Sequence, residues 1–491
     1  MRRALAPLVA VLALLVGSAV PAFAAAPPPL PRADPFYRYS GSTPLAQIAP
    51  GTVLDHRDVN LGLGTSAGPV PATQLLYRTS DEQGRPSATV TTLAVPPGAT
   101  VVPRVVAYLS FYDSLSDKCD PSYTLRGGDP GASNTQLTQV EQALVAQYYA
   151  SGYITTVPDF EGPGLHWTAG HEAGYGTLDA LRATESYLKL PSATPSALYG
   201  YSGGSIAADW ASELAPTYAN ELNIVGVAEG GIPVDFAHNL TYIEGSASWS
   251  GIIPAVLVAL SRAYGIDIPK YASAQGLALT DKVQDQCIGD FSGTTPGLTS
   301  DQLLKPEYRP LLAQPEFAGV INNLLMGTVP GHPKGPLLMA VGNDPNNSGA
   351  GPNDAKQGDD IMVTKDVEAL AHEYCGQGVP LQYQEIANTT HEQAAVVFEG
   401  LASTFIAERF NGVPFVSGCA SVGQGNDISP LSVRSSTATS TSAGSGSTPT
   451  SGSARATTST RALASTGAGH LAPVAGLLLL VGAVAVRRRR A

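Results

Sequence analysis

The chain has 491 residues, and its 28 basic and 40 acidic residues give a net charge of −12. Six of the arginines lie at the two ends, so the part between them carries 22 basic against 40 acidic residues. This balance argues against nucleic acid as a partner, because such binding depends on Lys and Arg side chains that neutralise phosphates. Roughly 400 residues remain between the ends, which allows a core domain with a large insertion.

Residues 1–24 have the pattern of a secretory signal peptide. A basic start, "MRR", precedes an apolar run that ends in "PAFA", with small side chains at Ala22 and Ala24. The alternative is a membrane anchor, but the apolar run is short for a bilayer span and a Pro-rich stretch follows it. We therefore expect an exported protein that is cut after Ala24.

The other end consists of a low-complexity segment and an apolar tail. Residues 426–462 are rich in Ser, Thr, Ala and Gly, which predicts a disordered stalk because little apolar surface is available to bury. Residues 463–491 contain "LASTG", then an apolar run, then four arginines. The apolar run would enter the membrane, and the arginines would stay on its cytoplasmic side. This order resembles a sortase sorting signal of Gram-positive bacteria, with Ala464 where the commoner pattern has proline. The resemblance implies cleavage between Thr466 and Gly467, with sortase and the cell wall as partners; a plain tail anchor is the alternative.

The part expected to fold contains four cysteines: Cys119, Cys287, Cys375 and Cys419. An even count in an exported chain predicts two disulfides, and three pairings are possible. No CxxC motif occurs, and no histidine stands at ligand spacing from a cysteine. We therefore expect no metal site built on these cysteines, and no cofactor.

Strands and helices alternate along residues 25–425. The expected strands are 74–96 (two, around Gly84), the start of 103–114, 153–162, 196–200, 223–233, 335–342 and 380–388, and the expected helices include 135–153, 174–189 and 364–378. Continuous apolar runs predict an α/β fold with a mostly parallel sheet covered by helices on both faces. The alternation breaks from about 234 to 330, where an apolar helix candidate and many prolines predict an inserted helical cap.

The stretch "YGYSGGS" at 199–205 places Ser202 between a predicted strand and a predicted helix. A serine nucleophile needs this sharp turn, and the flanking Gly200 and Gly204 let strand and helix approach closely. The helix that starts near Gly203 directs backbone N–H groups at the site, where they stabilise developing negative charge. The pattern predicts a hydrolase nucleophile, provided that a base and an acid follow along the chain.

His391 is the best candidate for the base, because it follows the last predicted strand and precedes the last predicted helix. His238 is the alternative base. Asp359 is the best candidate for the acid, since "DDIMV" leads from the loop after strand 335–342 into a helix, and Asp344, immediately after that strand, is the alternative. The Asn- and Asp-rich part of this loop reads as a solvated loop, with a weak calcium site as the other possibility.

Together with these residues, several longer motifs resemble the secretory lipase family, the lipase-A type of α/β-hydrolase known from yeasts and actinobacteria. The motifs are "DFEGPG" (159–164), "AGYGTLDALRA" (173–183), "GYSGG" (200–204), "GDDIMV" (358–363), "YCGQG" (374–378) and "HEQAA" (391–395). The resemblance covers roughly residues 35–420. It implies an α/β-hydrolase fold whose cap, at about 234–330, holds the acyl chain.

The resemblance also implies roles for individual residues. Ser202, Asp359 and His391 would form the catalytic triad, and the backbone N–H groups of Gly203 and Asp113 would form the oxyanion hole. The cysteines would pair as Cys119 with Cys287 and Cys375 with Cys419. Glu161, in "DFEGPG", is expected to hold a loop near the site.

We therefore expect a secreted, monomeric serine hydrolase that cleaves lipid or acyl esters through an acyl-enzyme, at the surface of a Gram-positive, actinobacterial cell. An esterase or a peptidase with the same triad is the first alternative, because a fold does not determine a substrate. A wall-displayed adhesin that keeps the hydrolase fold without its chemistry is the second, although all three triad residue types are present.

Overall fold

The computed structural model describes residues 27–63, 69–191, 193–347, 349–351 and 357–432. The expected signal peptide (1–24), the sorting signal (463–491) and all but the first residues of the expected stalk (426–462) lie outside the described residues.

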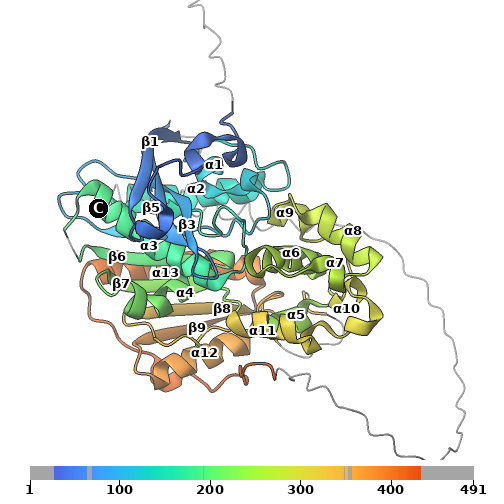
Figure 1. Cartoon of the computed structure of the whole chain (residues 1–491). Coiled ribbons are helices and arrows are strands. Elements are labelled where there is room, and N and C mark those ends of the chain that lie inside the picture. The colour runs from blue at the N-terminus through green and yellow to red at the C-terminus, as the bar shows by residue number, and fades with distance from the viewer. Residues whose placement is uncertain (1–26, 64–68, 192, 348, 352–356, 433–491) are drawn as a thin grey trace, which may run out of the picture.

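A nine-stranded sheet in the order β1-β2-β3-β5-β4-β6-β7-β8-β9 forms the centre of the molecule (Figure 1). β1 to β3 and β5 pair antiparallel, whereas the six strands from β4 to β9 run parallel to one another. The strands are β1 (Val53–Leu61), β2 (Val70–Ser80), β3 (Pro86–Ala94), β4 (Val105–Leu109), β5 (Ile154–Pro158), β6 (Pro195–Tyr201), β7 (Asn223–Gly230), β8 (Leu337–Asn343) and β9 (Leu381–Ala387).

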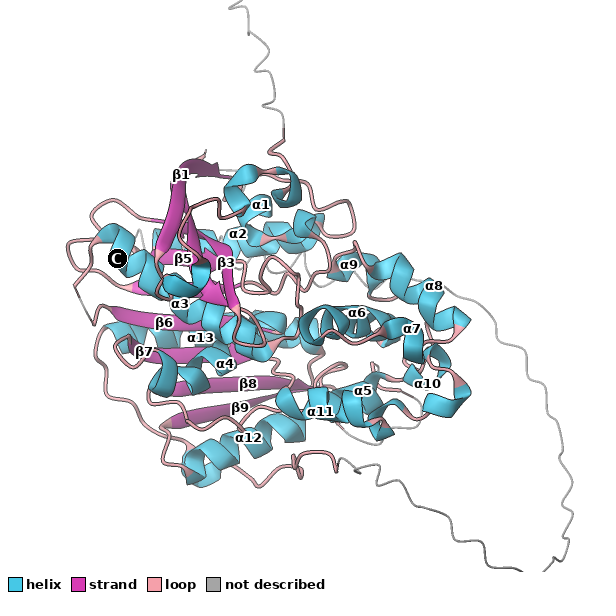
Figure 2. Cartoon of the chain, viewed as in Figure 1, coloured by secondary structure: helices cyan, strands magenta, loops and turns pink. Residues whose placement is uncertain are grey.

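Helices cover both faces of this sheet, which confirms the predicted fold class (Figure 2). Helices α2 (Thr135–Ala150) and α13 (His391–Phe410) pack on one face, and α3 (Gly170–Leu188), α4 (Gly203–Tyr218) and α12 (Thr364–Gly376) pack on the other. Successive side chains of a strand enter opposite cores, as the twofold periodicity of strands requires. In β4, for example, Val105 and Ala107 join one core while Val106 and Tyr108 join the other.

The predicted cap is a group of helices inserted between β7 and β8, at the right of Figures 1 and 2. The helices are α5 (Phe236–Ile243), α6 (Ile253–Tyr264), α7 (Ile268–Tyr271), α8 (Ala274–Val283), α9 (Ile288–Phe291), α10 (Ser300–Leu303) and α11 (Pro315–Asn323). The apolar run singled out in the sequence forms α6, with Pro254 in its first turn and Gly265 as a left-handed C-cap.

The structure adds one strand to those expected from the sequence, β1. Its sequence "VLDHRDVNL" mixes charged and apolar residues, because β1 is an edge strand and several of its side chains are exposed. It therefore lacks the continuous apolar run by which the buried parallel strands were recognised.

The described chain also stays attached to the fold beyond residue 425. The backbone N–H of Asn426 donates to the carbonyl of Lys365 at 3.0 Å. Leu431 and Asn322 of α11 exchange two hydrogen bonds, at 2.7 and 2.9 Å. Residues 426–432 thus lie against the folded domain, whereas the composition places them in the stalk.

Two disulfides are present and pair as the resemblance implies. Cys119–Cys287 joins a loop of the core to the start of α9 in the cap. Cys375–Cys419 joins the end of α12 to the C-terminal segment. Both link segments far apart in sequence, so each restricts the unfolded chain more than the folded one.

Candidate active site

Ser202 occupies the sharp turn between β6 and α4, with φ 54° and ψ −123°. This positive φ is strained for serine and is typical of a nucleophile elbow. The neighbouring glycines allow the strand and the helix to approach closely. A Cβ on Gly200 would lie 2.1 Å from the carbonyl oxygen of Gly204, and a Cβ on Gly204 would lie 2.1 Å from the carbonyl oxygen of Leu109. A backbone hydrogen bond from Ser202 to the carbonyl of Gly230, 2.8 Å, fixes the turn against β7.

The structure brings the three predicted triad residues together. His391 Nε2 lies 2.8 Å from Ser202 Oγ, and His391 Nδ1 lies 2.8 Å from Asp359 Oδ2. Ser202 and His391 are 189 residues apart in sequence. His391 is the first residue of α13, and Thr390 caps that helix with Gln393 in a capping box, which positions the imidazole at the carboxyl edge of the sheet.

The second oxygen of Asp359 holds this carboxylate in place. Asp359 Oδ1 accepts hydrogen bonds from the backbone N–H groups of Met362, at 2.8 Å, and Ile361, at 3.3 Å. Asp359 is fully buried, and the side chain of His391 is only 7% exposed. The two backbone N–H groups bind Oδ1 and so fix the orientation of the carboxylate. Oδ2 of Asp359 is therefore the oxygen that faces His391.

The alternative acid and base lie elsewhere. Asp344 accepts a hydrogen bond from the backbone N–H of Asn346 in its own loop, at 3.0 Å. His238 is on α5, where its Nδ1 lies 3.0 Å from both carboxylate oxygens of Asp366 on α12. In the part of the chain that the structure describes, the hydroxyl of Ser202 forms its hydrogen bond with His391 and with neither of these two residues.

The two expected oxyanion-hole residues also meet at Ser202. Gly203 is the first residue of α4, and the first N–H groups of a helix have no acceptor within it. Asp113 has a φ of 37°, and a Cβ built on Gly203 would lie 1.6 Å from its Oδ1, so this carboxyl group rests directly on the start of α4. The indole N–H of Trp167 donates to the same oxygen at 2.9 Å.

Burial changes the proton affinity of both titratable groups beside Ser202. Burial raises the pKa of Asp113 from 3.8 to about 7, although the Trp167 hydrogen bond and the nearby His391 oppose the change. Burial lowers the pKa of His391, but the charge and hydrogen bond of Asp359 more than offset this, so the pKa of His391 lies above its ordinary value of 6.5.

Two buried glutamates hold the segment that carries Asp113, and the sequence motifs did not point to the first of them. Glu141 of α2 accepts hydrogen bonds from the side chain of Ser110 and from the backbone N–H of Phe111. Glu161 accepts the backbone N–H of Ser114, at 3.2 Å to the nearer oxygen, as its expected loop-holding role requires. Burial raises the pKa of Glu161 well above its usual range and that of Glu141 to about 7.

The Asn- and Asp-rich loop was the alternative position for a metal ion. Residues 348 and 352–356 of that loop lie outside the described residues. Among the residues the structure does describe, no group of three or more His, Cys, Asp or Glu side chains is placed to hold a metal ion. The same part of the chain contains no helix that is both long and apolar enough to cross a bilayer.

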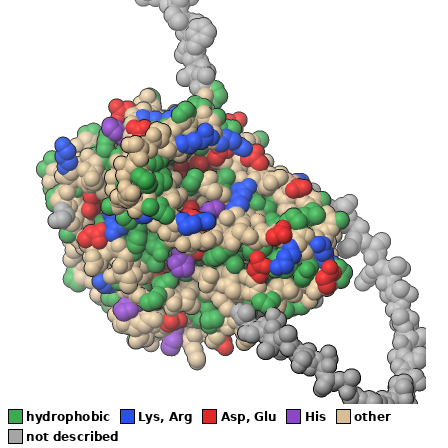
Figure 3. All heavy atoms as spheres, in the orientation of Figure 1, with side chains coloured by type: hydrophobic (Ala, Val, Ile, Leu, Met, Phe, Trp, Pro, Cys, Tyr) green, Lys and Arg blue, Asp and Glu red, His purple; other side chains and the backbone are tan. Residues whose placement is uncertain are grey.

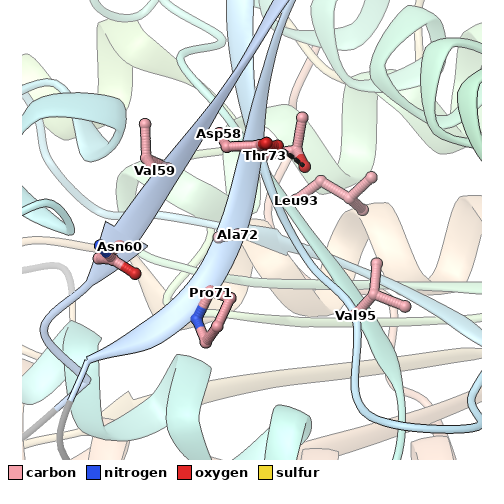
Figure 4. Close-up of a pocket in the computed structure, with 8 residues that line it drawn as sticks. All are labelled: Asp58, Val59, Asn60, Pro71, Ala72, Thr73, Leu93 and Val95. Atoms are coloured by element: carbon pink, nitrogen blue, oxygen red, sulfur yellow. Dashed lines mark hydrogen bonds between the residues drawn. The ribbon is translucent and has the colours of Figure 1, made fainter.

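A pocket of about 420 Å³ lies on the antiparallel part of the sheet, away from the triad (Figure 4). It is lined by Asp58, Val59, Asn60, Pro71, Ala72, Thr73, Leu93 and Val95. Within the triad, Asp359 and His391 are buried, whereas Ser202 is half-buried. Over the cap helices, at the right of Figure 3, acidic and basic side chains lie side by side, and Lys270 forms an ion pair with Glu316 at 3.2 Å.

Comparison with known proteins agrees with this geometry. The family model for secretory lipases matches residues 129–418. A probable inactive lipase of Mycobacterium tuberculosis is 32% identical over 79% of this chain and 84% of its own length. Lipase A of Arthroderma benhamiae is 31% identical over 79% of this chain and 81% of its own length.

Among solved structures, lipase A of Candida antarctica in its closed state superposes with a TM-score of 0.71. It is 27% identical, and the match covers 80% of this chain and 89% of that one. Together with the sheet, the cap and the elbow described above, these matches settle the family. The chain belongs to the secretory lipase family, and it is a carboxylic ester hydrolase of the α/β-hydrolase fold.

Proposed function

We propose that the protein is a secreted lipase that hydrolyses lipid acyl esters through the triad Ser202, His391 and Asp359. The observation that carries the proposal is the unbroken chain of two 2.8 Å contacts from the hydroxyl of Ser202 through the imidazole to the carboxylate. These two contacts also support an active enzyme, even though one relative of the protein is described as a probable inactive lipase.

In the acylation step, His391 Nε2 takes the proton of Ser202 while Oγ forms a bond to the ester carbonyl carbon. The carbonyl electron pair moves to the oxygen, which the backbone N–H groups of Gly203 and Asp113 stabilise. The intermediate then collapses: the carbonyl re-forms, the carbon–oxygen bond to the alcohol breaks, and His391 gives its proton to the leaving oxygen. Asp359 keeps Nδ1 protonated throughout and stabilises the imidazolium.

Deacylation repeats these steps with water in place of serine. His391 takes a proton from water, whose oxygen attacks the acyl carbon, and the bond to Ser202 Oγ breaks as His391 returns the proton to the serine. The net reaction consumes one ester and one water and releases an alcohol and a carboxylic acid. The residues of this chain account for every proton transfer.

The substrate class is tested by turnover of matched chromogenic substrates. We expect hydrolysis of p-nitrophenyl octanoate at least as fast as that of p-nitrophenyl acetate, because the cap contains the strongly apolar helix α6. Preference for the acetate would indicate an esterase of short acyl chains. Turnover of aminoacyl p-nitroanilides alone would indicate a peptidase, and failure of a fluorophosphonate probe to label the intact protein would leave only the adhesin.

The pH dependence of kcat/KM is expected to be bell-shaped, with a maximum near neutrality. Activity rises with pH as His391 loses its proton, at a pKa above 6.5, because only the neutral imidazole can accept the proton of Ser202. Activity falls as Asp113, whose pKa is about 7, becomes a carboxylate beside the developing oxyanion and repels it.

The variant Asp113→Asn isolates the alkaline limb of this profile. Asparagine keeps the backbone N–H and an oxygen for the indole of Trp167, but it does not titrate. We expect the acid limb to remain and the alkaline decline to weaken. An unchanged alkaline decline in the variant would assign that limb to another group.

We also propose wall anchoring at the surface of a Gram-positive cell, on the basis of the sorting-signal resemblance of residues 463–491. In a host that contains sortase, the protein is expected in the cell-wall fraction, with Thr466 as its last residue. Deletion of residues 463–491 should release it into the medium. Recovery of the intact tail in the membrane fraction would support the tail anchor instead.

A further inference from the structure

Two aromatic rings contact the imidazole of His391 in the part of the chain that the structure describes. The ring of Tyr201, at the end of β6, lies 5.0 Å from it between centroids, and the ring of Trp249 lies 6.3 Å away at 80°. Tyr201 is only 4% exposed, and its hydroxyl donates to the carbonyl of His391 at 2.6 Å, so it belongs to the support of the histidine. Trp249 is half-buried and comes from the cap, between α5 and α6.

The chemistry of the triad assigns a direction to the two parts of an ester. The alcohol oxygen must approach His391 Nε2, because that atom protonates it as it leaves. The carbonyl oxygen must instead face Gly203 and Asp113. The alcohol part therefore leaves along the side of the site where the imidazole lies, and the cap residue in contact with the imidazole is Trp249.

A second tryptophan, Trp167, lies beside the oxyanion-hole residues rather than beside the imidazole. Trp167 donates to Asp113 at 2.9 Å, and its ring lies 5.6 Å from that of Phe291 on α9. Trp167 is thus associated with the oxyanion residues and Trp249 with the general acid.

The backbone around Trp249 is anchored by hydrogen bonds on both sides. Its N–H donates to the hydroxyl of Ser246 at 2.9 Å, and the carbonyl of Ser248 accepts the N–H of Gly293 at 2.8 Å. The hydroxyl of Ser250 lies 2.8 Å from the carbonyl of Ser246 and 2.8 Å from that of Thr295, and it can donate its proton to either. Because this turn is held from several directions, the size of the indole, rather than movement of the loop, limits the space beside His391.

We propose that Trp249 is a specificity-determining residue for the alcohol part of the ester. The proposal rests on the proposed triad mechanism, because the direction of the leaving alcohol follows from the role of His391. It restricts bulky secondary alcohols at the acylation step and leaves the acyl chain unaffected. Deacylation is also unaffected, since the alcohol has by then departed and esters of one acid form the same acyl-enzyme.

The experiment compares wild type, Trp249→Ala and Trp249→Phe on two substrate series. The alcohol series is methyl butyrate and cyclohexyl butyrate, measured by acid release, and the acyl series is p-nitrophenyl butyrate and octanoate. In Trp249→Ala we expect the kcat/KM ratio of cyclohexyl to methyl ester to rise about tenfold, a typical effect of opening a pocket by a few carbon atoms. The phenylalanine variant should rise less, and the octanoate to butyrate ratio should stay within about twofold of wild type.

Tyr308→Ala is the matched control, because Tyr308 is a half-buried aromatic residue of the cap whose ring lies 4.9 Å from that of Tyr271, not against His391. We expect both of its substrate ratios to equal those of wild type. An unchanged alcohol ratio in the Trp249 variants, or a change in the acyl ratio instead, would overturn the proposal. If the alanine variant does not fold, the phenylalanine variant decides by the same ratios.

Labelling by a fluorophosphonate probe separates this proposal from the proposed function. Labelling and p-nitrophenyl butyrate hydrolysis by wild type establish the serine hydrolase, whatever the Trp249 variants do. If wild type neither labels nor hydrolyses, the triad mechanism fails, and the assignment of Trp249 fails with it.

Discussion

Replacing Ser202 with alanine is expected to lower kcat/KM for p-nitrophenyl butyrate by about 10⁴-fold or more and to abolish fluorophosphonate labelling. Alanine lacks Oγ, the atom that forms the acyl-enzyme. The oxyanion-hole donors and the cap can then still bind a substrate, but no nucleophile attacks its carbonyl carbon. Alanine also keeps the Cβ that the elbow already accommodates, so the melting temperature should stay close to that of wild type.

Ser212→Ala is the matched control for this experiment. Ser212 is a buried serine of the same helix, α4, and its hydroxyl donates to the carbonyl of Asp209 at 2.8 Å. Wild-type turnover is expected for this control. Turnover by Ser202→Ala at the level of the control would show that another nucleophile or no covalent step is used, and the proposed lipase mechanism would be abandoned.

The second large effect is expected for Asp359→Asn, a loss of about 10⁴-fold in kcat with little change in fold. The backbone N–H groups of Met362 and Ile361 require an oxygen at the position of Oδ1, so the asparagine must turn its NH₂ group toward His391. That group donates to Nδ1 and forces the proton onto Nε2, where it faces Ser202. The imidazole is then the wrong tautomer to accept the proton of the serine.

Asp344→Asn is the control that decides between the two candidate acids. Asp344 accepts a hydrogen bond from the backbone of Asn346, whereas the carboxylate that lies 2.8 Å from His391 Nδ1 belongs to Asp359, so the Asp344 variant should retain activity within about threefold. A severe loss in Asp344→Asn together with normal activity in Asp359→Asn would reverse the assignment of the acid.

Much of the core was predictable because buried parallel strands have a strong signature. β4, β6, β7 and β8 are short apolar runs between turn residues, and each is followed by a helix or by the cap. β1 was not predictable by this rule, since an edge strand exposes part of its surface and can carry charges. Residues 426–432 illustrate the same limit: their attachment depends on single pairs such as Leu431 with Asn322, which composition does not reveal.

Some residues of the candidate site could likewise be predicted from the sequence, and others could not. Ser202 could be found from its glycines, because the steric demands of the elbow are local and leave a mark in the sequence. His391 and Asp359 could be ranked by their places after strands. Trp167 and Trp249 belong to no motif, since their contacts with Asp113 and His391 join residues that only the folded cap and core bring together.

The sequence by itself determined the alternation of strands and helices, the inserted cap and the order of nucleophile, acid and base, because these depend on local periodicity and turn chemistry. The tertiary structure decided which aspartate faces His391 and which aromatic side chains surround the reacting atoms. Those choices depend on distances of a few ångströms between segments that are up to 190 residues apart. Local preference cannot encode such distances, because packing of the whole sheet and cap sets them.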